Sequence, residues 1–332
     1  MNVTCPNCKQ VYELKDENLQ TINDLVRMPC PNCKTIIAID LTQSDKDVPP
    51  APTGKDLKDR IFNSLHDLPP MPQVAQKART VISDPDSSFA DLARVIETDQ
   101  GIATRILKMA NSAYYGMSGN ISSVQHAAVV LGTKTLMELL TLACSSKILG
   151  KTLSGYDLAA GDLWQHSLAV AYGSQLIART VHSHLEQDAF AAGLIHDAGK
   201  LILDPYLGER KEEFQAFVRE GKETFLEAEK RILGFDHAEL ASEVCAKWHI
   251  PDHIALAIRY HHDPTPAHGD VLAHIVHASD SIAIMSGIGS GIDGMLYRMH
   301  PETVALLGLT EDTVSGIMAG MAHYIDKTSQ EL

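Results

Sequence analysis

Residues 188–200, DAFAAGLIHDAGK, place a histidine and an aspartate side by side at His196 and Asp197. Alanine and isoleucine recur three residues apart before the pair, which predicts a closely packed helix that ends there. Adjacent helical side chains point about 100° apart, yet both can reach one ion beyond the helix end. A buried carboxylate beside an imidazole needs a compensating cation, commonly a divalent metal. From these two residues alone, a solvated helix end is the competing interpretation.

Other potential metal ligands lie in separate segments with helical patterns: His166, His237, the pair His261 and His262, and Asp280. Asp162 precedes His166 by four residues and shares its helix face, and Lys200 follows Asp197 by three. Taken singly, each has an ordinary structural explanation, such as a hydrogen-bonded core histidine, an exposed helix C-terminus or an N-cap partner. Their order along the chain, H, HD, H, HH, D, makes the set informative.

The N-terminal segment carries two identical CPNCK sequences, with Cys5 and Cys8 in the first and Cys30 and Cys33 in the second. Two such pairs supply four thiolates for a tetrahedral zinc ion. The alternative, two disulfides, requires an oxidising compartment. Strand-like sequences flank the pairs, so we expect a small β zinc ribbon over residues 1–40. Acidic residues outnumber basic ones there, which favours a structural or protein-contact role over DNA binding.

Residues 41–55, LTQSDKDVPPAPTGK, contain three prolines and no apolar period, which predicts a linker. From Leu57 onward the apolar spacing is helical almost throughout, and no long strand-like alternation interrupts it. The predicted helices include 74–82, 89–96, 99–116, 121–132, 133–149 and 311–325. The sequence therefore predicts an all-α domain that follows a small β domain.

The 332-residue chain has a formal net charge of −14. This charge disfavours broad electrostatic attachment to nucleic acid or to an anionic membrane. No run of 18 or more apolar residues occurs, and the polar, cysteine-bearing start differs from a signal peptide. We therefore expect a cytoplasmic protein with no membrane-spanning segment.

Three separated blocks, LPPMP at 68–72, DQGIATRILKMANSAYYG at 99–116 and ISSVQHAAVVLG at 121–132, resemble the HDOD domain of bacterial signalling proteins. That domain is an α-helical relative of the HD phosphohydrolases. The resemblance extends from about residue 55 to beyond residue 280. It implies an HDOD domain over residues 56–332, with a helical lobe at 56–150 and an HD-like metal-site lobe at 151–332.

The histidine and aspartate order resembles the metal-ligand order of HD phosphohydrolases and, with the later histidines, that of HD-GYP phosphodiesterases. By this resemblance one metal is held by His166, His196, Asp197 and Asp280, and a second by His237, His261 and His262, with Asp197 bridging and Asp162 as an extra ligand in some relatives. Imidazole and carboxylate ligands suit Fe, Mn, Zn, Ni or Co. Two such ions would lower the pKa of a bridging water and neutralise phosphoryl charge.

By the same resemblance Asp197 is the central catalytic residue, and Lys200 either pairs with a substrate phosphate or is a solvated helix-end lysine. The GYP element is missing after His262, so hydrolysis of cyclic di-GMP is not implied. Two functions follow. The first is a metal-dependent phosphohydrolase that acts on a nucleotide or other phosphoester; the second is a catalytically silent signalling domain that binds partner proteins. Of the remaining histidines, we expect His277 to support the ligands, because it precedes Asp280 by nearly one turn.

Overall fold

A computed structural model describes residues 2–4, 7–13, 25–40, 54–64, 73–115, 121–220, 224–248, 250–289 and 298–329. The chain separates into two compact units, Met1–Pro52 and Thr53–Leu332. Cys5, most of the predicted linker and the LPPMP block lie outside the described residues. The domain boundaries within the second unit stay a prediction, and one hydrophobic cluster there includes both Leu57 and Tyr324.

The first unit contains two antiparallel hairpins. Strand β1 (Asn2–Thr4) pairs with β2 (Val11–Glu13), and β3 (Leu25–Pro29) pairs with β4 (Ile36–Asp40). Residues 7–9 of the first CPNCK sequence and residues 30–34 of the second lie between the paired strands, and the lysine of each adopts a left-handed backbone, with φ of 61° at Lys9 and 63° at Lys34. The two identical sequences thus share the same unusual lysine conformation, while the zinc ribbon stays a prediction.

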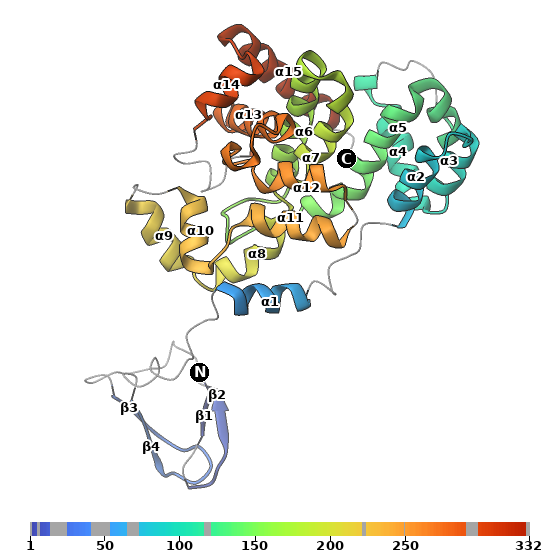
Figure 1. Cartoon of the computed structure of the whole chain (residues 1–332). Helices are drawn as coiled ribbons and strands as arrows, with labels where there is room; N and C mark the ends of the chain where they lie inside the picture. The colour runs from blue at the N-terminus through green and yellow to red at the C-terminus, as the bar shows by residue number, and fades with distance from the viewer. Residues whose placement is uncertain are drawn as a thin grey trace. The chain divides into compact units, whose positions relative to one another are not determined.

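The second unit is helical, which confirms the predicted all-α fold (Figure 1). Its N-terminal third contains α1 (Gly54–Ser64), α2 (Gln73–Ser83), α3 (Phe89–Ile96), α4 (Gln100–Ala110), a 3₁₀ turn η4 (Ala113–Tyr115) and α5 (Val124–Leu149). Its middle contains α6 (Asp162–Val181), η5 (Ser183–Leu185), α7 (Glu186–Ile195), α8 (Ala198–Gly208), α9 (Lys211–Glu220) and α10 (Phe225–Leu233). The C-terminal part contains α11 (His237–Lys247), α12 (Asp252–Arg259), η6 (Thr265–Ala267), α13 (Val271–Met285), α14 (Pro301–Leu307) and α15 (Glu311–Ser329).

Helix boundaries follow local capping chemistry. Helix α3 begins after Ser88, whose hydroxyl accepts from the Asp91 N–H while the Asp91 carboxylate accepts from the Ser88 N–H. The two helices predicted at 121–132 and 133–149 meet at Gly132, where non-helical backbone forms a kink within α5. Gly132 has a φ of +81°, which glycine adopts without steric cost. The chain therefore bends at this residue where we predicted a helix boundary.

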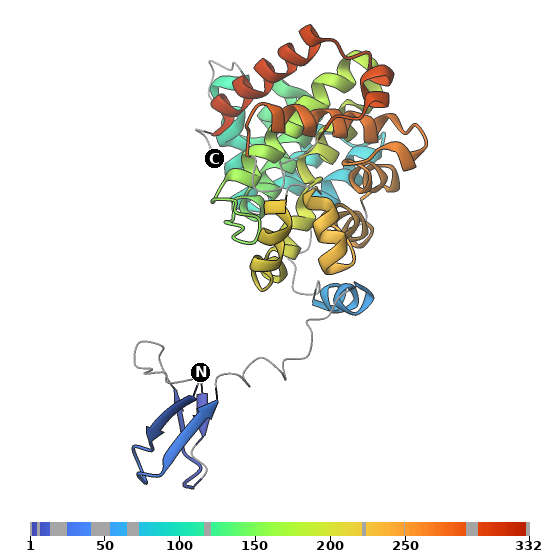
Figure 2. The ribbon, with the colours of Figure 1, turned by 90° about the vertical axis from the view of Figure 1, so that its left-hand side faces the viewer.

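Helices α6 and α7 form the centre of the helical unit, and α13 and α15 pack against α6 (Figures 1 and 2). Small residues permit the close approach. A Cβ atom at Gly193 of α7 would lie 2.8 Å from the backbone of Ala171 in α6. Helix α5 packs on α3, α4 and α7 and buries Leu136, Leu139 and Leu140 completely. The tight α6–α7 contact fixes the helix that ends at His196.

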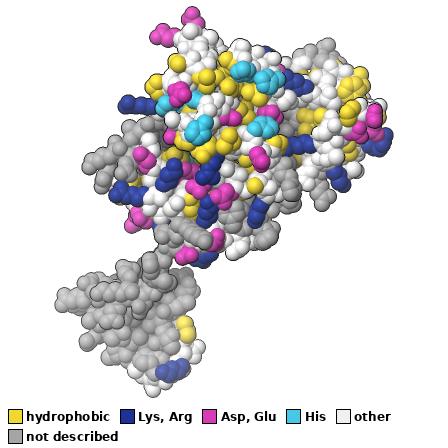
Figure 3. Space-filling model, in the orientation of Figure 1, with side chains coloured by type: hydrophobic (Ala, Val, Ile, Leu, Met, Phe, Trp, Pro, Cys, Tyr) yellow, Lys and Arg dark blue, Asp and Glu magenta, His cyan; other side chains and the backbone are white. Residues whose placement is uncertain are grey.

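Among the described residues, one helix segment, Val124–Ser146, is long enough and apolar enough to cross a membrane, judged by length and composition alone. It is the greater part of α5, whose buried leucines belong to the hydrophobic core of the helical unit. On the face of this unit seen in Figure 3, acidic and basic side chains are interspersed rather than separated into patches of one sign. Core packing therefore accounts for the apolar character of α5.

Candidate metal centre

Six helices and their ends bring seven of the predicted ligands to one place. His166 lies in the first half of α6, His196 ends α7, Asp197 precedes α8, His237 opens α11, and Asp280 lies in α13. These five side chains are 0–4% exposed. The pair His261 and His262 follows α12, with His261 buried and His262 partly buried. Lys200, on α8, is 3% exposed.

Glycine at position 199 is what allows α8 to begin against α11. A Cβ atom there would lie 2.0 Å from the backbone oxygen of His237. Real Cβ atoms essentially never approach so closely, so only glycine fits between the two helix starts. This contact brings Asp197 and His237 together.

One side of the cluster combines α6, α7 and α13. His166 Nε2 lies 3.0 Å from Asp280 Oδ1 and 3.7 Å from Asp197 Oδ2. His196 Nε2 lies 3.3 Å from Asp197 Oδ2 and 3.9 Å from Asp280 Oδ1. One ligand atom each from His166, His196 and Asp197 falls within 4.8 Å of the others, and so do those of His196, His261 and Asp280.

The other side uses the second carboxylate oxygen of Asp197. His237 Nε2 lies 3.2 Å from Asp197 Oδ1, and His261 Nε2 lies 3.8 Å from it. The Nε2 atoms of His237 and His262 are 2.8 Å apart. Asp197, His237, His261 and His262 form a further group with ligand atoms within 4.8 Å. Asp197 thus presents one oxygen to each side, as a bridging carboxylate would.

Backbone carbonyls orient three of the histidine rings. The Nδ1 atoms of His166, His196 and His261 lie 3.1, 2.7 and 2.7 Å from the carbonyl oxygens of Ile288, Gly193 and Ile258. A carbonyl oxygen only accepts, so each Nδ1 carries the hydrogen and each Nε2 of a neutral ring directs a lone pair into the cluster. Metal-bound histidines show this outer contact in most proteins.

The fourth ring, that of His237, is held by a residue that the sequence analysis missed. Glu229, fully buried on α10, accepts hydrogen bonds from His237 Nδ1 at 2.7 Å and from the His237 backbone N–H at 2.9 Å. Its other oxygen accepts from the Tyr156 hydroxyl at 2.5 Å. Glu229 lies in AEKRIL among other charged residues, so only its phase on the apolar face of α10 could have marked it.

The donor set fits a bound cation. In neutral rings whose Nδ1 carries the hydrogen, the Nε2 lone pairs of His166 and His237 face carboxylate oxygens at 3.0 and 3.2 Å, so acceptor faces acceptor unless a proton or metal lies between. Within the described part of the chain, His196 Nε2, Asp197 Oδ1 and Asp280 Oδ2 are buried and make no hydrogen bond. Leaving buried acceptors unsatisfied is costly, so these residues are suited to hold a cation.

The protonation states of two histidines and of both aspartates suit metal binding. Burial lowers the pKa of His261 to about 3 and that of His262 well below its usual range, so both rings are neutral at pH 7. Burial alone would raise the pKa values of Asp197 and Asp280, but neighbouring histidines, and Lys200 for Asp197, outweigh it and hold both well below the usual range. Neutral imidazoles and ionised carboxylates are the forms that bind metals.

Burial also opposes the charged form of His237, but the carboxylates of Glu229 and Asp197 outweigh it and raise its pKa to about 10. In the metal-free protein the short contact between His237 and His262 therefore has His237 as the proton donor. A metal bound on this side would have to displace that proton.

Lys200 lies inside the cluster of ligands, whereas Asp162 lies at the start of α6. Lys200 Nζ lies 2.6 Å from Asp197 Oδ2 and 5.8 Å from the centre of the Tyr156 ring, so it is buried within the cluster rather than solvated. Asp162 accepts a hydrogen bond from the Ala159 N–H at 2.7 Å at the start of α6, and it belongs to none of the ligand groups in the described residues. The role of Asp162 as a ligand stays a prediction.

His277 is buried and lies behind the ligands. Its Nδ1 is 2.7 Å from the backbone oxygen of His261, and its Nε2 accepts from the His300 N–H at 2.9 Å. It fixes the backbone from which the His261 ring projects, in keeping with the supporting role predicted for it.

Three thiols of the first unit also converge. The sulfurs of Cys8, Cys30 and Cys33 lie within 4.8 Å of one another, and those of Cys8 and Cys30 are 3.6 Å apart. The Cys33 N–H donates to the Cys30 sulfur at 3.5 Å.

A family model for the HDOD domain matches residues 68–264, more than half of the chain. The chain therefore belongs to the HDOD family. Its helical fold agrees with this assignment.

An uncharacterised protein of Treponema pallidum is 26% identical over 207 residues, which cover 61% of this chain and 39% of that protein's own length. An HDOD domain protein of unknown function from Geobacter sulfurreducens is 24% identical, with a TM-score of 0.64 over 81% of this chain and 97% of the other. A Shewanella amazonensis protein, described as a "putative phosphohydrolase", is 22% identical, with a TM-score of 0.62 over 82% of this chain and 98% of the other. At these identities the likeness to the two solved structures shows the fold.

Proposed function

We propose that the helical unit is a metal-dependent phosphohydrolase that acts on a nucleotide or other phosphoester. The observation that carries the proposal is the convergence of five imidazoles and two carboxylates on one buried cluster, in which His196 Nε2, Asp197 Oδ1 and Asp280 Oδ2 make no hydrogen bond to the described residues. The phosphohydrolase description of the structurally similar Shewanella protein supports the same class of reaction.

His166, His196, Asp197 and Asp280 would hold one ion, and His237, His261 and His262 a second, with Asp197 shared. Bound there, Fe, Mn, Zn, Ni or Co would lower the pKa of a water and neutralise charge on phosphoryl oxygens. Asp197 would hold both sides at a fixed separation, because each of its oxygens faces a different group of histidines. Lys200 would supply a positive charge beside the reacting phosphate once the ions compensate Asp197.

The test measures metal content and activity on the full chain, purified without chelators. Elemental mass spectrometry should find one or two transition-metal ions per chain that remain when the Cys30→Ser/Cys33→Ser variant has lost the zinc of the first unit. The variant His196→Ala/Asp197→Ala should lose them, whereas His323→Ala/Asp326→Ala, an exposed pair on α15, should keep them. Release of 4-nitrophenol from 4-nitrophenyl phosphate and its diester should follow metal content. Full activity in Asp197→Ala would sink the proposal.

A second candidate function is a signalling domain that binds partner proteins, with any metal serving structure alone. The observation that favours it is the ion pair between Lys200 and Asp197, because this internal ammonium already compensates part of the carboxylate charge. Under this function, His196→Ala/Asp197→Ala leaves partner capture unchanged while the folded chain turns over no phosphoester. Failure of the wild-type full chain to retrieve any signalling protein would count against it.

We also propose that the CPNC turns hold a structural zinc ion. The three converging thiols support this, and Cys5, outside the described residues, would be the fourth ligand. The same mass spectrometry tests it: Cys30→Ser/Cys33→Ser should lose one zinc per chain and keep the metals of the helical unit. Unchanged zinc content would contradict the proposal.

A further inference from the structure

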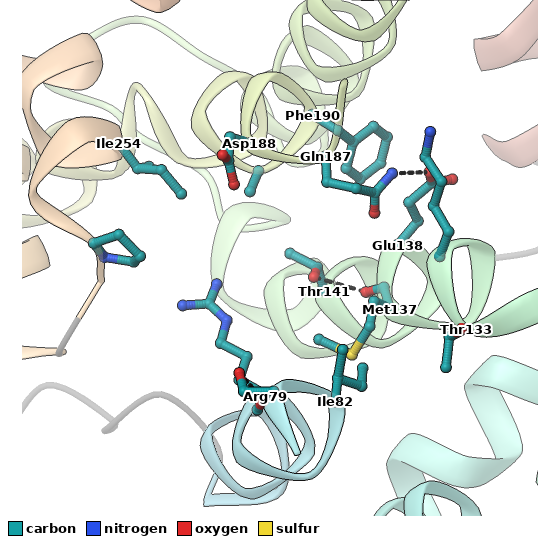
Figure 4. A pocket seen from close by; sticks show the side chains of 14 residues that line it. Arg79, Ile82, Thr133, Met137, Glu138, Thr141, Gln187, Asp188, Phe190 and Ile254 are labelled. Carbon is teal, nitrogen blue, oxygen red and sulfur yellow. Dashed lines mark hydrogen bonds between the residues drawn. The ribbon is translucent and has the colours of Figure 1, made fainter. Parts of the chain in front are cut away.

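A cavity of about 630 Å³ opens between α2, α5, α7 and the start of α12, and none of the proposed metal ligands lines it (Figure 4). Its apolar walls include Ile82 of α2, Met137 of α5, Phe190 of α7 and Ile254 of α12. Cavities of this size and lining are typical of sites for small organic molecules.

Three of the four charged side chains in this cavity already have partners. Lys134 pairs with Glu186. Glu138 accepts hydrogen bonds from the Gln175 and Gln187 amides at 2.7 and 2.8 Å, and Asp188 pairs with His253 at 3.0 Å. An occupant would therefore meet these three groups with hydrogen-bond or ion-pair partners already in place.

The fourth is Arg79, whose side chain extends from α2 toward Asp188 across the opening (Figure 4). Within the described part of the chain its guanidinium makes no hydrogen bond and no ion pair. Burial lowers the pKa of Arg79, although the carboxylate of Asp188 acts in the opposite sense. A partly desolvated guanidinium stays protonated in proteins and keeps its full set of donors.

We propose that this cavity binds a small organic anion, a carboxylate or phosphate monoester on an alkyl or aryl body. The planar fork of Arg79 fits either anionic head with paired hydrogen bonds. The apolar walls around Phe190 and Ile254 would cover the body. The site lies on different residues from the metal centre, so it stands whether or not the phosphohydrolase proposal holds.

The experiment titrates the full chain by calorimetry with phenylalkanoates, alkanoates and aryl phosphates, each matched by its neutral amide or alcohol. Two variants test the site. Arg79→Gln removes the guanidinium and should leave folding intact, because that group has no hydrogen-bond or ion-pair partner among the described residues. Ala191→Phe places a ring in the cavity. Arg94→Gln on α3, whose side chain is 75% exposed, is the control for loss of one positive charge.

We expect saturable binding of at least one anion, with the neutral analogue weaker by about tenfold or more, the loss that one charge-assisted partner brings. Arg79→Gln and Ala191→Phe should lose this binding to a similar degree, whereas Arg94→Gln and His196→Ala/Asp197→Ala should keep it. Whether carboxylates or phosphate monoesters bind more tightly identifies the head group. No saturable binding at millimolar concentration, or binding unchanged in both cavity variants, overturns the proposal.

Discussion

Replacing Gly199 by alanine should damage stability and the metal centre together. The added Cβ would lie 2.0 Å from the backbone oxygen of His237 and 2.8 Å from its carbonyl carbon. Because both are backbone atoms, no side chain can rotate away, and α8 or α11 must move by about an ångström to restore ordinary contact. Forced overpacking of this kind costs about 1–3 kcal/mol, and here we expect the upper part of that range. The movement separates Asp197 from His237, which metal sites tolerate poorly.

Helix α8 supplies its own control. A Cβ at Gly208, the last residue of the same helix, would meet nothing within 4 Å, so Gly208→Ala should be neutral or stabilising by about 0.5 kcal/mol. Urea unfolding of the metal-free chains should give a lower midpoint for Gly199→Ala with an unchanged slope. Elemental mass spectrometry should show reduced metal in that variant alone. A Gly199→Ala protein with wild-type midpoint and full metal content would refute the reasoning.

Three further substitutions test single contacts. Glu229→Gln keeps an acceptor for His237 but removes its charge, so metal affinity should fall about 10- to 100-fold in a chelator competition with little loss of stability. Lys200→Met leaves the buried carboxylate of Asp197 uncompensated and should destabilise the metal-free chain by about 3–5 kcal/mol, with added Mn²⁺ restoring much of the loss in thermal melts. Burial alone would raise the pKa of Glu186, but its basic partners outweigh burial and hold the pKa below the ordinary value of 4.5. The stability that the ionised carboxylate contributes is therefore present above pH 4.5 and is lost as the pH falls below it. Glu186→Gln should thus flatten the acid limb of a stability–pH profile.

Much of the candidate centre could be predicted because ligand identity resides in residue type and order. His196 and Asp197 are adjacent in sequence at the end of α7. Helix geometry therefore already predicts that both side chains can reach one ion beyond the helix end. The rest of the set depended on the family resemblance, since nothing local brings His166 near Asp280 from 114 residues away. Tertiary packing of α6 on α13 makes that contact.

Other features lay beyond local sequence signals. Glu229 and Tyr156 are 73 residues apart, and each resembles an ordinary helix or turn residue until the fold joins them. The helix boundary predicted at Gly132 is where the backbone leaves helical geometry, so this glycine, unlike Glu229, carried a local signal. The cavity at Arg79 is built from four helices, so no single segment carries its signature.

Helix α7 connects the two sites that we propose. Asp188 and Phe190 line the cavity in its first half, and His196 lies at its end, about 9–12 Å further along at the helical rise of 1.5 Å per residue. Helix α12 repeats the arrangement, since Ile254 lines the cavity and His261 follows its last turn. An occupant of the cavity thus contacts two of the helices that position metal ligands. If occupation favours one position of α7 over another, linkage requires that metal and anion alter each other's affinity by the same factor. Because Gly193 packs tightly on α6, α7 has little room to bend within the helix. Coupling between the two sites would therefore act through small shifts of α7 and α12 as rigid bodies.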